Sequence, residues 1–455
     1  MYFTTGSYII SKSLTLDGIA NITITGSKEA ILKLADNANC HVIYINNTRR
    51  VRIEKIEING NKNNQTPSDG IRGIEVWNSS DIFIRNIYIH DTYGATIGLH
   101  DCTRAGIYNS VLENTNGDCT FAFNVDYLKF VGNVCKDYVD TGVAHFGKYT
   151  VIANNIFDGG YCGVYLGTAG VKTEEVAVVG NVFRNHTTAG VKIDEPKEEN
   201  VEPTEKITVA GNTFEYCNAA IWMEAKDYSG IRNIVIANNV VLASTKKGII
   251  AGTLSPDTSP IYKLVIIGNI VAYSGEAGIC LVRAKHSLIA NNIVYNNGQS
   301  TPNPGILLYG DDYGGATYNY VIGNKCFDDQ ATKTQNYGIA ESGPSDYNII
   351  MFNDVRENKN GGITKVGANT IVKHNIGFLT ENSGVAVFSG DGATTQFAIA
   401  HGLVSTPSKV LVTPMSADAK GISYVTADDT YIYVNYDTAP PSGTDNVKIS
   451  WYAEV

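Results

Sequence analysis

Several features are scarce or missing in this chain of 455 residues, and each absence narrows its class. No run of 18 or more apolar residues occurs, so no segment is expected to span a membrane as a helix. Charged residues make up only 18% of the chain and the net charge is −10, which leaves no basic stripe for binding nucleic acid. The same acidic balance disfavours a general attraction for acidic polymers, although a locally basic groove could still bind one.

Metal-type cysteine spacing and a leader segment are also missing. The eight cysteines are scattered without CxxC or zinc-type pairs, so we interpret them as small core residues and expect no cofactor. The chain opens at Met1 directly on strand-like alternation, "MYFTTGSYIISKSLTLDG". We therefore expect a truncated N-terminus, which leaves the compartment open.

A repeated phrase organises most of the chain. Two or three β-branched residues followed by an asparagine recur every 22 to 32 residues. These asparagines are Asn86, Asn109, Asn133, Asn155, Asn181, Asn212, Asn239, Asn269, Asn292, Asn324, Asn353 and Asn375. A second strand-like phrase such as "GVYLGT" or "GVKIDE" follows each of them, and helix-period stretches are nearly absent. The spacing predicts an all-β fold, a right-handed parallel β-helix of about 12–14 coils in which the asparagines occupy tight corners and bond to the neighbouring coil.

The same segments resemble a known superfamily. "YFTTGSYIISKSLTLDGIANITITG", "INGNKNNQ" at 58–65 and the serial "GN" and "NN" phrases are similar to pectate-lyase-like β-helices, above all to tailspike-type polysaccharide depolymerases of bacteriophages. This resemblance covers residues 1–383 and implies a polysaccharide partner, an extracellular or virion-surface location, and glycoside hydrolase or polysaccharide lyase activity. Non-catalytic glycan-binding adhesins and tail-fibre modules share the repeats, so binding alone stays open as the alternative. The "GHG" string of polygalacturonases and the "YDPHE" string of alginate epimerases are both missing.

Residues 384–455 form a second unit in the sequence. Short strand-like runs such as "KVLVTP" and "TYIYVNY" alternate with turn residues, which predicts a small antiparallel β-sandwich. The string "HGLVSTPSKVLVTP" resembles terminal modules of phage tail fibres and, more loosely, H-type lectin domains. That resemblance implies a homotrimer, and the module is expected to cap the solenoid or to bind carbohydrate.

Candidate chemistry comes from the side chains that should point outward from one row of strands. Alternation gives outward pairs in successive coils. The expected pairs are Glu75/Trp77, Ile97/Leu99, Phe121/Phe123, Ala144/Phe146, Tyr165/Gly167, Lys192/Asp194, Trp222/Glu224, Ile250/Gly252, Cys280/Val282 and Leu307/Tyr309. Asp194 and Glu224 would then lie one coil apart, so that one carboxyl holds a proton and the other stays charged, as glycosidic cleavage requires.

The residues around this pair have supporting roles in the same hypothesis. Lys192 is expected to steady charge, and Trp222, Tyr165 and Glu195 to contact the sugar. Insertions such as "DEPKEENVEPTE", "AKDYSG", "GTLSPDTSP" and "YGDDYGG" follow this row and would form the wall of a groove. Glu198, Glu199, Glu202 and Glu205 in the first insertion offer a weakly supported calcium site. The plain alternative is a solvated polar face with ordinary loops.

A second candidate site lies nearer the N-terminus. Asp118 and Asp140 precede consecutive strands, as the acids of tailspike-like hydrolases often do, and His145 with Lys148 and Tyr149 could serve proton abstraction. Alternation points His145 inward, which favours a core histidine instead. Phe121, Phe123, Phe146 and Leu99 are expected to form an exposed apolar strip that meets a partner or an absent N-terminal segment.

Overall fold

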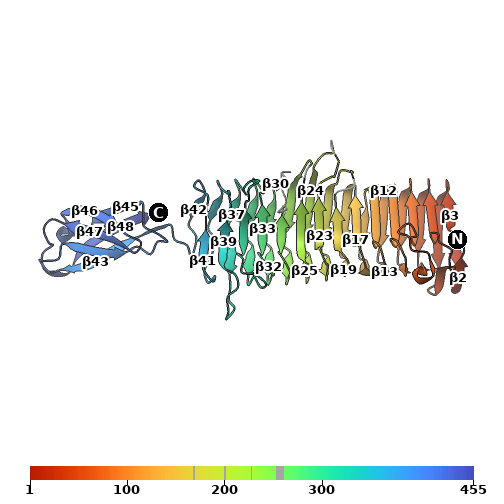
Figure 1. Cartoon of the computed structure of the whole chain (residues 1–455), viewed down its shortest axis with the longest axis horizontal. Helices are drawn as coiled ribbons and strands as arrows, with labels where there is room; N and C mark the ends of the chain where they lie inside the picture. Colours follow the sequence, from red (N-terminus) through yellow and green to blue (C-terminus); the bar gives the residue numbers. More distant parts are fainter. Residues whose placement is uncertain (168–169, 199–200, 227, 253–260) are drawn as a thin grey trace.

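The computed structural model describes residues 1–167, 170–198, 201–226, 228–252 and 261–455. They form a long solenoid of parallel strands with a smaller antiparallel module beyond its C-terminal end (Figure 1). Two 3-10 helices, η1 (Lys62–Asn64) and η2 (Ala417–Ala419), are the helical elements among these residues, and neither is long or apolar enough to cross a membrane. The prediction of a right-handed parallel β-helix followed by antiparallel sheets is confirmed.

Each coil contributes up to three strands, which stack into three rows. The front row comprises β3 (Leu14–Asp17), β6 (Ile43–Asn46), β9 (Ile74–Trp77), β12 (Ile97–Tyr108), β14 (Thr120–Asp126), β17 (Thr141–Phe146), β20 (Cys162–Leu166), β23 (Ala189–Asp194), β26 (Ala219–Glu224), β29 (Ile249–Ala251), β33 (Ile279–Val282), β36 (Ile306–Tyr309), β39 (Tyr337–Glu341) and β41 (Gly361–Thr364). The side row comprises β1 (Tyr2–Phe3), β4 (Ala20–Gly26), β7 (Arg49–Glu54), β10 (Ser80–Arg85), β15 (Lys129–Val131), β18 (Lys148–Ala153), β21 (Glu174–Val179), β24 (Thr204–Ala210), β27 (Ile231–Ala237), β30 (Ile261–Tyr262), β31 (Val265–Ile267), β34 (Leu288–Ala290), β37 (Tyr320–Ile322), β40 (Ile349–Met351) and β42 (Ile371–Lys373). β12 is long enough to bend from the front row into the side row, which joins the two rows into one sheet.

The back row is a separate sheet of thirteen parallel strands. It comprises β2 (Gly6–Ile10), β5 (Ala30–Leu34), β8 (Glu57–Asn59), β11 (Tyr88–His90), β13 (Val111–Thr115), β16 (Val134–Tyr138), β19 (Ile156–Asp158), β22 (Val182–Arg184), β25 (Thr213–Glu215), β28 (Val240–Leu242), β32 (Ile270–Ala272), β35 (Ile293–Tyr295) and β38 (Lys325–Phe327). Its thirteen members agree with the predicted number of coils.

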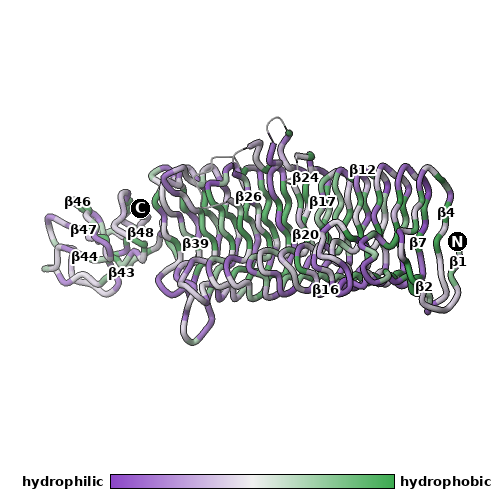
Figure 2. Tube along the Cα trace, turned by 45° about the vertical axis from the view of Figure 1, so that its right-hand side comes forward, coloured by the Kyte–Doolittle hydropathy of each residue, from purple (hydrophilic) through white to green (hydrophobic). Residues whose placement is uncertain are grey.

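The interior of the solenoid is a column of stacked apolar side chains. Phe157 stacks on Phe183 at 5.1 Å between ring centroids, and Phe183 stacks on Phe214 at 4.8 Å. These distances match the spacing of neighbouring strands, because equivalent residues of successive coils lie one above the other. The hydropathy of the trace alternates along the coils for the same reason, since inward and outward residues alternate along each strand (Figure 2).

The recurring asparagines form a buried ladder at the corner between the side and back rows. The backbone N–H of Asn212 donates to Oδ1 of Asn239 at 3.0 Å, and Nδ2 of Asn239 donates to the carbonyl oxygen of Val209 at 2.9 Å. The same pattern connects Asn239 to Asn269 in the next coil. The predicted bonding between stacked asparagines is therefore present, and it satisfies backbone groups that the corner would leave unpaired.

One detail of that corner differs from the sequence expectation. The left-handed residue is usually the one before the ladder asparagine, as at Gly132 (φ 72°), Asn154 (φ 56°) and Gly180 (φ 67°). Asn86 and Asn109 do adopt this conformation themselves, with φ values of 51° and 48°. In the "GN" and "NN" pairs the first residue adopts the left-handed conformation of the turn. The second residue is the asparagine whose side chain bonds to the neighbouring coils.

The C-terminal module is a sandwich of two three-stranded antiparallel sheets. One sheet has the order β43 (Glu381–Gly390), β48 (Gly443–Glu454), β45 (Lys409–Pro414), and the other has β44 (Gln396–Ala400), β47 (Tyr431–Tyr436), β46 (Ile422–Ala427). Trp451, Phe397 and their neighbours form a core separate from that of the solenoid. An ion pair of 2.6 Å between Lys373 of β42 and Glu454 of β48 ties the module to the last coil.

Candidate functional site

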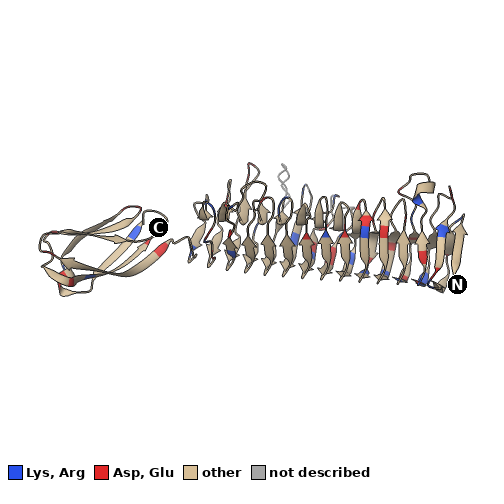
Figure 3. Ribbon diagram, turned by 90° about the horizontal axis from the view of Figure 1, so that it is seen from below, with Lys and Arg blue, Asp and Glu red and all other residues tan. Residues whose placement is uncertain are grey.

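The outer face of the front row carries the predicted site, and the strand register decides which side chains share it. Tyr165 is directly opposite Lys192, Lys192 opposite Trp222, and Asp194 opposite Glu224 in neighbouring strands. The two columns that the sequence placed side by side therefore do run down this face. On the side of the solenoid seen from below, away from this face, the ribbon is coloured for charged residues mainly toward the N-terminal end, and the strands nearer the C-terminal module are almost uniformly tan (Figure 3).

One coil was placed in the wrong register by the sequence reading. The outward residues of β12 are Gly98 and His100, which lie opposite Phe121 and Phe123, whereas Ile97 and Leu99 are fully buried inside the coil. A shift of one residue exchanges the two faces of a strand, and the repeat phrase in this coil begins one residue later than assumed. The prediction that Leu99 belongs to an exposed apolar strip is therefore wrong. Phe121 and Phe123 remain on the face.

Lys192 lies between the two candidate acids. Its Nζ is 3.2 Å from Oδ2 of Asp194 and 2.8 Å from Oε2 of Glu224, which places these two oxygens no more than about 6 Å apart. The Tyr165 hydroxyl donates to the same Asp194 oxygen at 2.7 Å. Glu224 has a second cation, Lys226, at 3.1 Å from its other oxygen.

These contacts shift the pKa values of the two carboxyl groups in opposite directions. Burial raises the pKa of Asp194 above its ordinary value, although the charge of Lys192 and the Tyr165 hydrogen bond act against the shift. Burial acts in the same sense on Glu224, but the hydrogen bond and charge of Lys192, together with Lys226, hold the pKa of Glu224 below its ordinary value. Lys192 loses solvation on burial, yet the two carboxylates raise its pKa, so it stays protonated.

Two polar atoms of this cluster have no hydrogen-bond partner among the described residues. They are Oδ1 of Asp194, which needs a donor, and Nε1 of Trp222, which needs an acceptor. The Lys192 ammonium is 5.3 Å from the centroid of the Tyr165 ring and 5.0 Å from that of Trp222, so it lies over one face of each ring. Asp194 and Glu224 are only 3% and 8% exposed, and the cluster meets solvent mainly through the half-buried Tyr165 and Trp222.

Glu195, the third predicted sugar contact, has a different environment. It is 2% exposed, and its carboxylate accepts hydrogen bonds from the backbone N–H groups of Lys226, Tyr228 (3.2 Å) and Gly230 (2.8 Å). Glu195 therefore holds the loop after β26 in place, directly beside Glu224. Its predicted role in binding a ligand has no support in this geometry.

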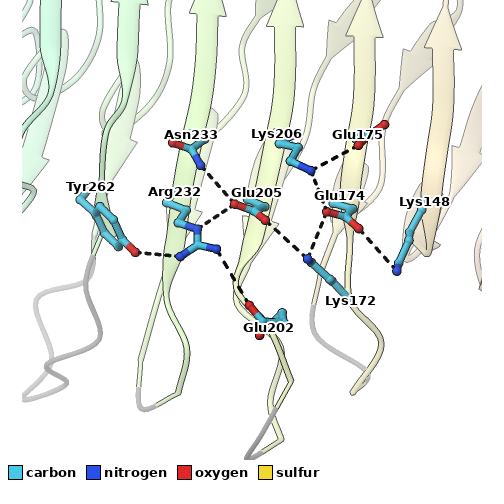
Figure 4. Close-up of polar contacts among 10 residues, drawn as sticks. All are labelled: Lys148, Lys172, Glu174, Glu175, Glu202, Glu205, Lys206, Arg232, Asn233 and Tyr262. Carbon is cyan, nitrogen blue, oxygen red and sulfur yellow. Dashed lines mark hydrogen bonds and ion pairs between the residues drawn. The ribbon is translucent and has the colours of Figure 1, made fainter.

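The insertions after β20, β23 and β26 return to the side row through a ladder of ion pairs (Figure 4). Arg232 donates to Glu205 at 2.7 Å, and Lys172 lies 3.4 Å from Glu205 and 3.1 Å from Glu174. The hydrogen bond from Arg232 is the main reason that the pKa of Glu205 falls to about 2. Because each carboxylate has a cation beside it, the ladder anchors the loop ends and offers no free acidic cluster.

This ladder bears on the calcium prediction. Glu205 is bound to Arg232, and Glu202 lies 3.9 Å from the same guanidinium. Glu198 is exposed, and Glu199 lies outside the described residues, as does most of the "GTLSPDTSP" insertion. Across the described ranges no three His, Cys, Asp or Glu side chains come together in a way that could hold a metal ion.

The second candidate site is only partly assembled. Asp118 is half-buried, and the desolvation of its carboxyl group together with the charge of exposed Asp140 raises the pKa of Asp118 to about 7. His145 is fully buried inside the coil, where its Nε2 is 2.9 Å from the Thr150 hydroxyl and burial lowers its pKa to about 4. His145 therefore cannot act with these aspartates on the outer face, in agreement with its inward position in the alternation.

A further polar cluster on the same face was missed. Glu75 accepts from Arg72 at 2.6 Å and from Trp77 at 2.8 Å, while the His100 ring stacks on Trp77 at 4.0 Å. A Cβ on Gly98 would lie 2.0 Å from the Glu75 carboxylate, so only glycine leaves room for the Arg72–Glu75 pair. The signal in the sequence was the isolated glycine in "ATIGLH", which the register error assigned to the interior.

Comparison with known proteins supports the fold. A family model described as "Periplasmic copper-binding protein (NosD)" matches residues 130–337, which is under half of the chain. In the part of the chain that the structure describes, no group of three His, Cys, Asp or Glu side chains is placed to hold the copper named in that description. No curated protein sequence matches the chain.

Solved structures with the same architecture come from several sources. The tailspike protein of Escherichia coli bacteriophage HK620, solved with a pentasaccharide, is 11% identical with a TM-score of 0.54, and the match covers 95% of this chain and 87% of that one. PfbA, a surface adhesin of Streptococcus pneumoniae, is 14% identical with a TM-score of 0.54, covering 69% and 85%. A mannuronan C-5 epimerase module of Azotobacter vinelandii is 16% identical with a TM-score of 0.42, covering 82% and 90%. At these identities the two matches with a TM-score of 0.54 concern the fold alone.

Proposed function

We propose that this protein binds a polysaccharide on the outer face of its front row and cleaves glycosidic bonds at Asp194 and Glu224. The observation that carries the proposal is the direct pairing of Asp194 with Glu224 in neighbouring strands around Lys192, in surroundings that raise the pKa of Asp194 and lower that of Glu224. A carboxyl that keeps its proton next to one that stays ionised is the combination that glycoside hydrolysis needs.

The distances favour a particular stereochemical course. Retaining enzymes hold their carboxyl groups about 5–5.5 Å apart and inverting enzymes about 6.5–9.5 Å, and the limit of about 6 Å set by Lys192 fits the first class. Asp194 then protonates the leaving oxygen as the glycosidic C–O bond breaks, and Glu224 forms an ester with the anomeric carbon. Water next attacks that carbon, gives its proton back to Asp194 and frees the Glu224 carboxylate.

The neighbouring side chains have roles in this scheme. Lys192 keeps Glu224 ionised and remains protonated itself, so it acts through charge and not as a base. Tyr165 orients Asp194 through its hydroxyl, and the rims of Tyr165 and Trp222 offer apolar contact to sugar rings. Asp118 and Asp140 stay the second choice for the acids, since the pKa of Asp118 is raised to about 7.

Single substitutions test the assignment. Asp194→Asn and Glu224→Gln keep the shape of each side chain, and each should lower turnover by about 10²–10⁴-fold because acid catalysis or the nucleophile is lost. Turnover is measured as new reducing ends, with the ultraviolet absorbance of unsaturated sugars followed in parallel to detect lyase action. Asp158→Asn, on back-row strand β19 and outside both candidate sites, serves as the matched control. Normal cleavage by both cluster variants would transfer the assignment to Asp118 and Asp140.

A binding-only role is the second candidate. The strong burial of Asp194 and Glu224 favours it, as does the structural similarity to a surface adhesin. Tight retention of a polysaccharide without reducing ends or unsaturated sugars would identify this role. In either case an extracellular or virion-surface location is part of the proposal.

We further propose a homotrimer, assembled through the C-terminal module. Val385, Val387 and Leu411 on the outer face of the β43–β48–β45 sheet are 55%, 46% and 58% exposed, so aliphatic side chains gather on one face of this sheet, as at sites that meet a partner. Light scattering on the intact chain should give three times the mass of the monomer. A Leu411→Lys variant should shift that mass toward the monomer, and an unchanged mass would place the interface elsewhere.

A further inference from the structure

We infer that the polysaccharide recognised by this face is built from uncharged sugars, and that its cleavage is hydrolysis and not elimination. The inference rests on the proposed function and adds the chemical class of the substrate. It follows from which charges on the face are already neutralised within the protein and from which buried polar atoms lack a partner among the described residues.

The cations of the face are engaged within the protein. Across front-row strands β14 to β36, Lys192 is the single lysine or arginine in the described ranges. It contacts two carboxylates and lies over two aromatic rings, so a sugar carboxylate would have to displace a partner that is already in place. Breaking such a buried pair costs more than an exposed ion pair returns.

The cations beside the face are paired in the same way. Lys226 contacts Glu224 at 3.1 Å, and Arg72 contacts Glu75 at 2.6 Å. Lys197 is exposed on the insertion after β23, where a single solvated ammonium contributes little to binding. A uronate or sulfated chain would meet no buried free cation here, and the net charge of −10 would repel it from a distance.

Two buried polar atoms of the cluster have no hydrogen-bond partner in the part of the chain that the structure describes, and their chemistry suits a hydroxyl. Oδ1 of Asp194 and Nε1 of Trp222 lack partners among the described residues, and Asp194 is 3% exposed. A hydroxyl can both donate and accept a hydrogen bond, so it suits these atoms in either protonation state of Asp194, whereas a carboxylate can only accept and would face the ionised Glu224 with like charge. Elimination from a uronate also needs its carboxylate neutralised by a cation, which the paired lysines do not supply.

Matched pairs of polysaccharides test this inference. Alginate and polygalacturonate are each compared with their carboxyl-reduced neutral forms, alongside a panel of neutral glycans, in binding and in cleavage by the intact chain. Each neutral chain should be bound at least about tenfold more tightly than its charged form. A tenfold difference corresponds to about 1.4 kcal/mol, the cost expected from charge repulsion and from competition with the existing ion pairs. Reducing ends should appear on neutral chains without ultraviolet absorbance.

The outcomes separate this inference from the function on which it rests. Unsaturated ends from a uronate chain, or equal binding of charged and reduced forms, would overturn the neutral class while leaving polysaccharide processing intact. Preferential binding of neutral chains without cleavage would support uncharged polysaccharides as the ligand and would contradict the proposed catalytic activity. Absence of binding to every chain in the panel would overturn both.

Discussion

Replacing Lys192 by methionine is the most informative perturbation of the candidate site. Methionine fills much of the same volume but removes the ammonium, leaving Asp194 and Glu224 one coil apart with nothing between them. The Lys192 side chain is 8% exposed, and its partners are 4% and 9% exposed. Removal of one partner from a buried ionic cluster of this kind typically costs about 3–5 kcal/mol, so we expect a loss in that range near neutral pH.

The expected loss depends on pH, and its sign follows from the carboxyl groups. Without the ammonium, repulsion and burial place both folded-state pKa values above those of the unfolded chain. The penalty is then present above these raised values and disappears as acid protonates the carboxyls. Wild type also loses the stabilisation of Glu224, whose pKa is held low, when the pH falls. The difference between the two proteins should therefore shrink to within about 1 kcal/mol near pH 4.

The assay is urea unfolding of wild type and Lys192→Met at several pH values between about 7 and 4. Lys226→Met is the matched control, because that side chain is 45% exposed and its pair with Glu224 should contribute no more than about 1 kcal/mol. A Lys192→Met protein as stable as wild type at neutral pH would refute the reasoning, and so would a loss that stays constant down to pH 4.

Two further predictions concern the frame around the site. Glu205→Gln should cost about 1–3 kcal/mol near neutral pH. Because the pKa of Glu205 is about 2 in the folded chain against an ordinary 4.5, its stabilisation exists above pH 4.5 and is lost toward pH 2, so acid titration of both proteins should bring their stabilities together. Asn239→Ala removes the partner of Asn212 and of the Val209 carbonyl in a fully buried position, with an expected loss of about 2–4 kcal/mol and faster amide exchange in those coils. Unchanged exchange at Asn212 would contradict the ladder as a source of stability.

The architecture was accessible from sequence because the solenoid repeats its own pattern. The asparagine phrases marked the coils, and the period-two alternation placed Lys192, Asp194, Trp222 and Glu224 on one face, where the register puts them. Errors arose where the repeat is irregular. In "ATIGLH" a one-residue offset hid His100, although the glycine at position 98 sets that phrase apart from its neighbours.

Contacts between distant loops lay beyond any local pattern. Glu195 was predicted to contact the sugar, because its actual partners could not be foreseen. They are the backbone N–H groups of Lys226, Tyr228 and Gly230, which are more than thirty residues away and carry no sequence signature. The burial of Asp194 is a similar case, since its degree depends on how insertions of different coils pack together. The sequence shows which side chains can carry a charge. Whether each charge has an oppositely charged partner depends on residues that come close together only in the folded coils.

Asp194 and Glu224 lie on adjacent coils. The backbone hydrogen bonds between β23 and β26, and not side-chain packing, therefore fix the distance between these two residues. Duplicating a whole turn elsewhere in the solenoid would leave that spacing untouched, whereas splicing one turn between β23 and β26 would add a single strand spacing of about 4.8 Å. The distance between the two carboxyl groups can therefore grow only by whole strand spacings. One added coil would make it longer than the separation that the proposed retaining mechanism requires. In a solenoid of stacked coils, inserting or deleting coils can therefore change the distance between two such side chains only by whole multiples of the strand spacing.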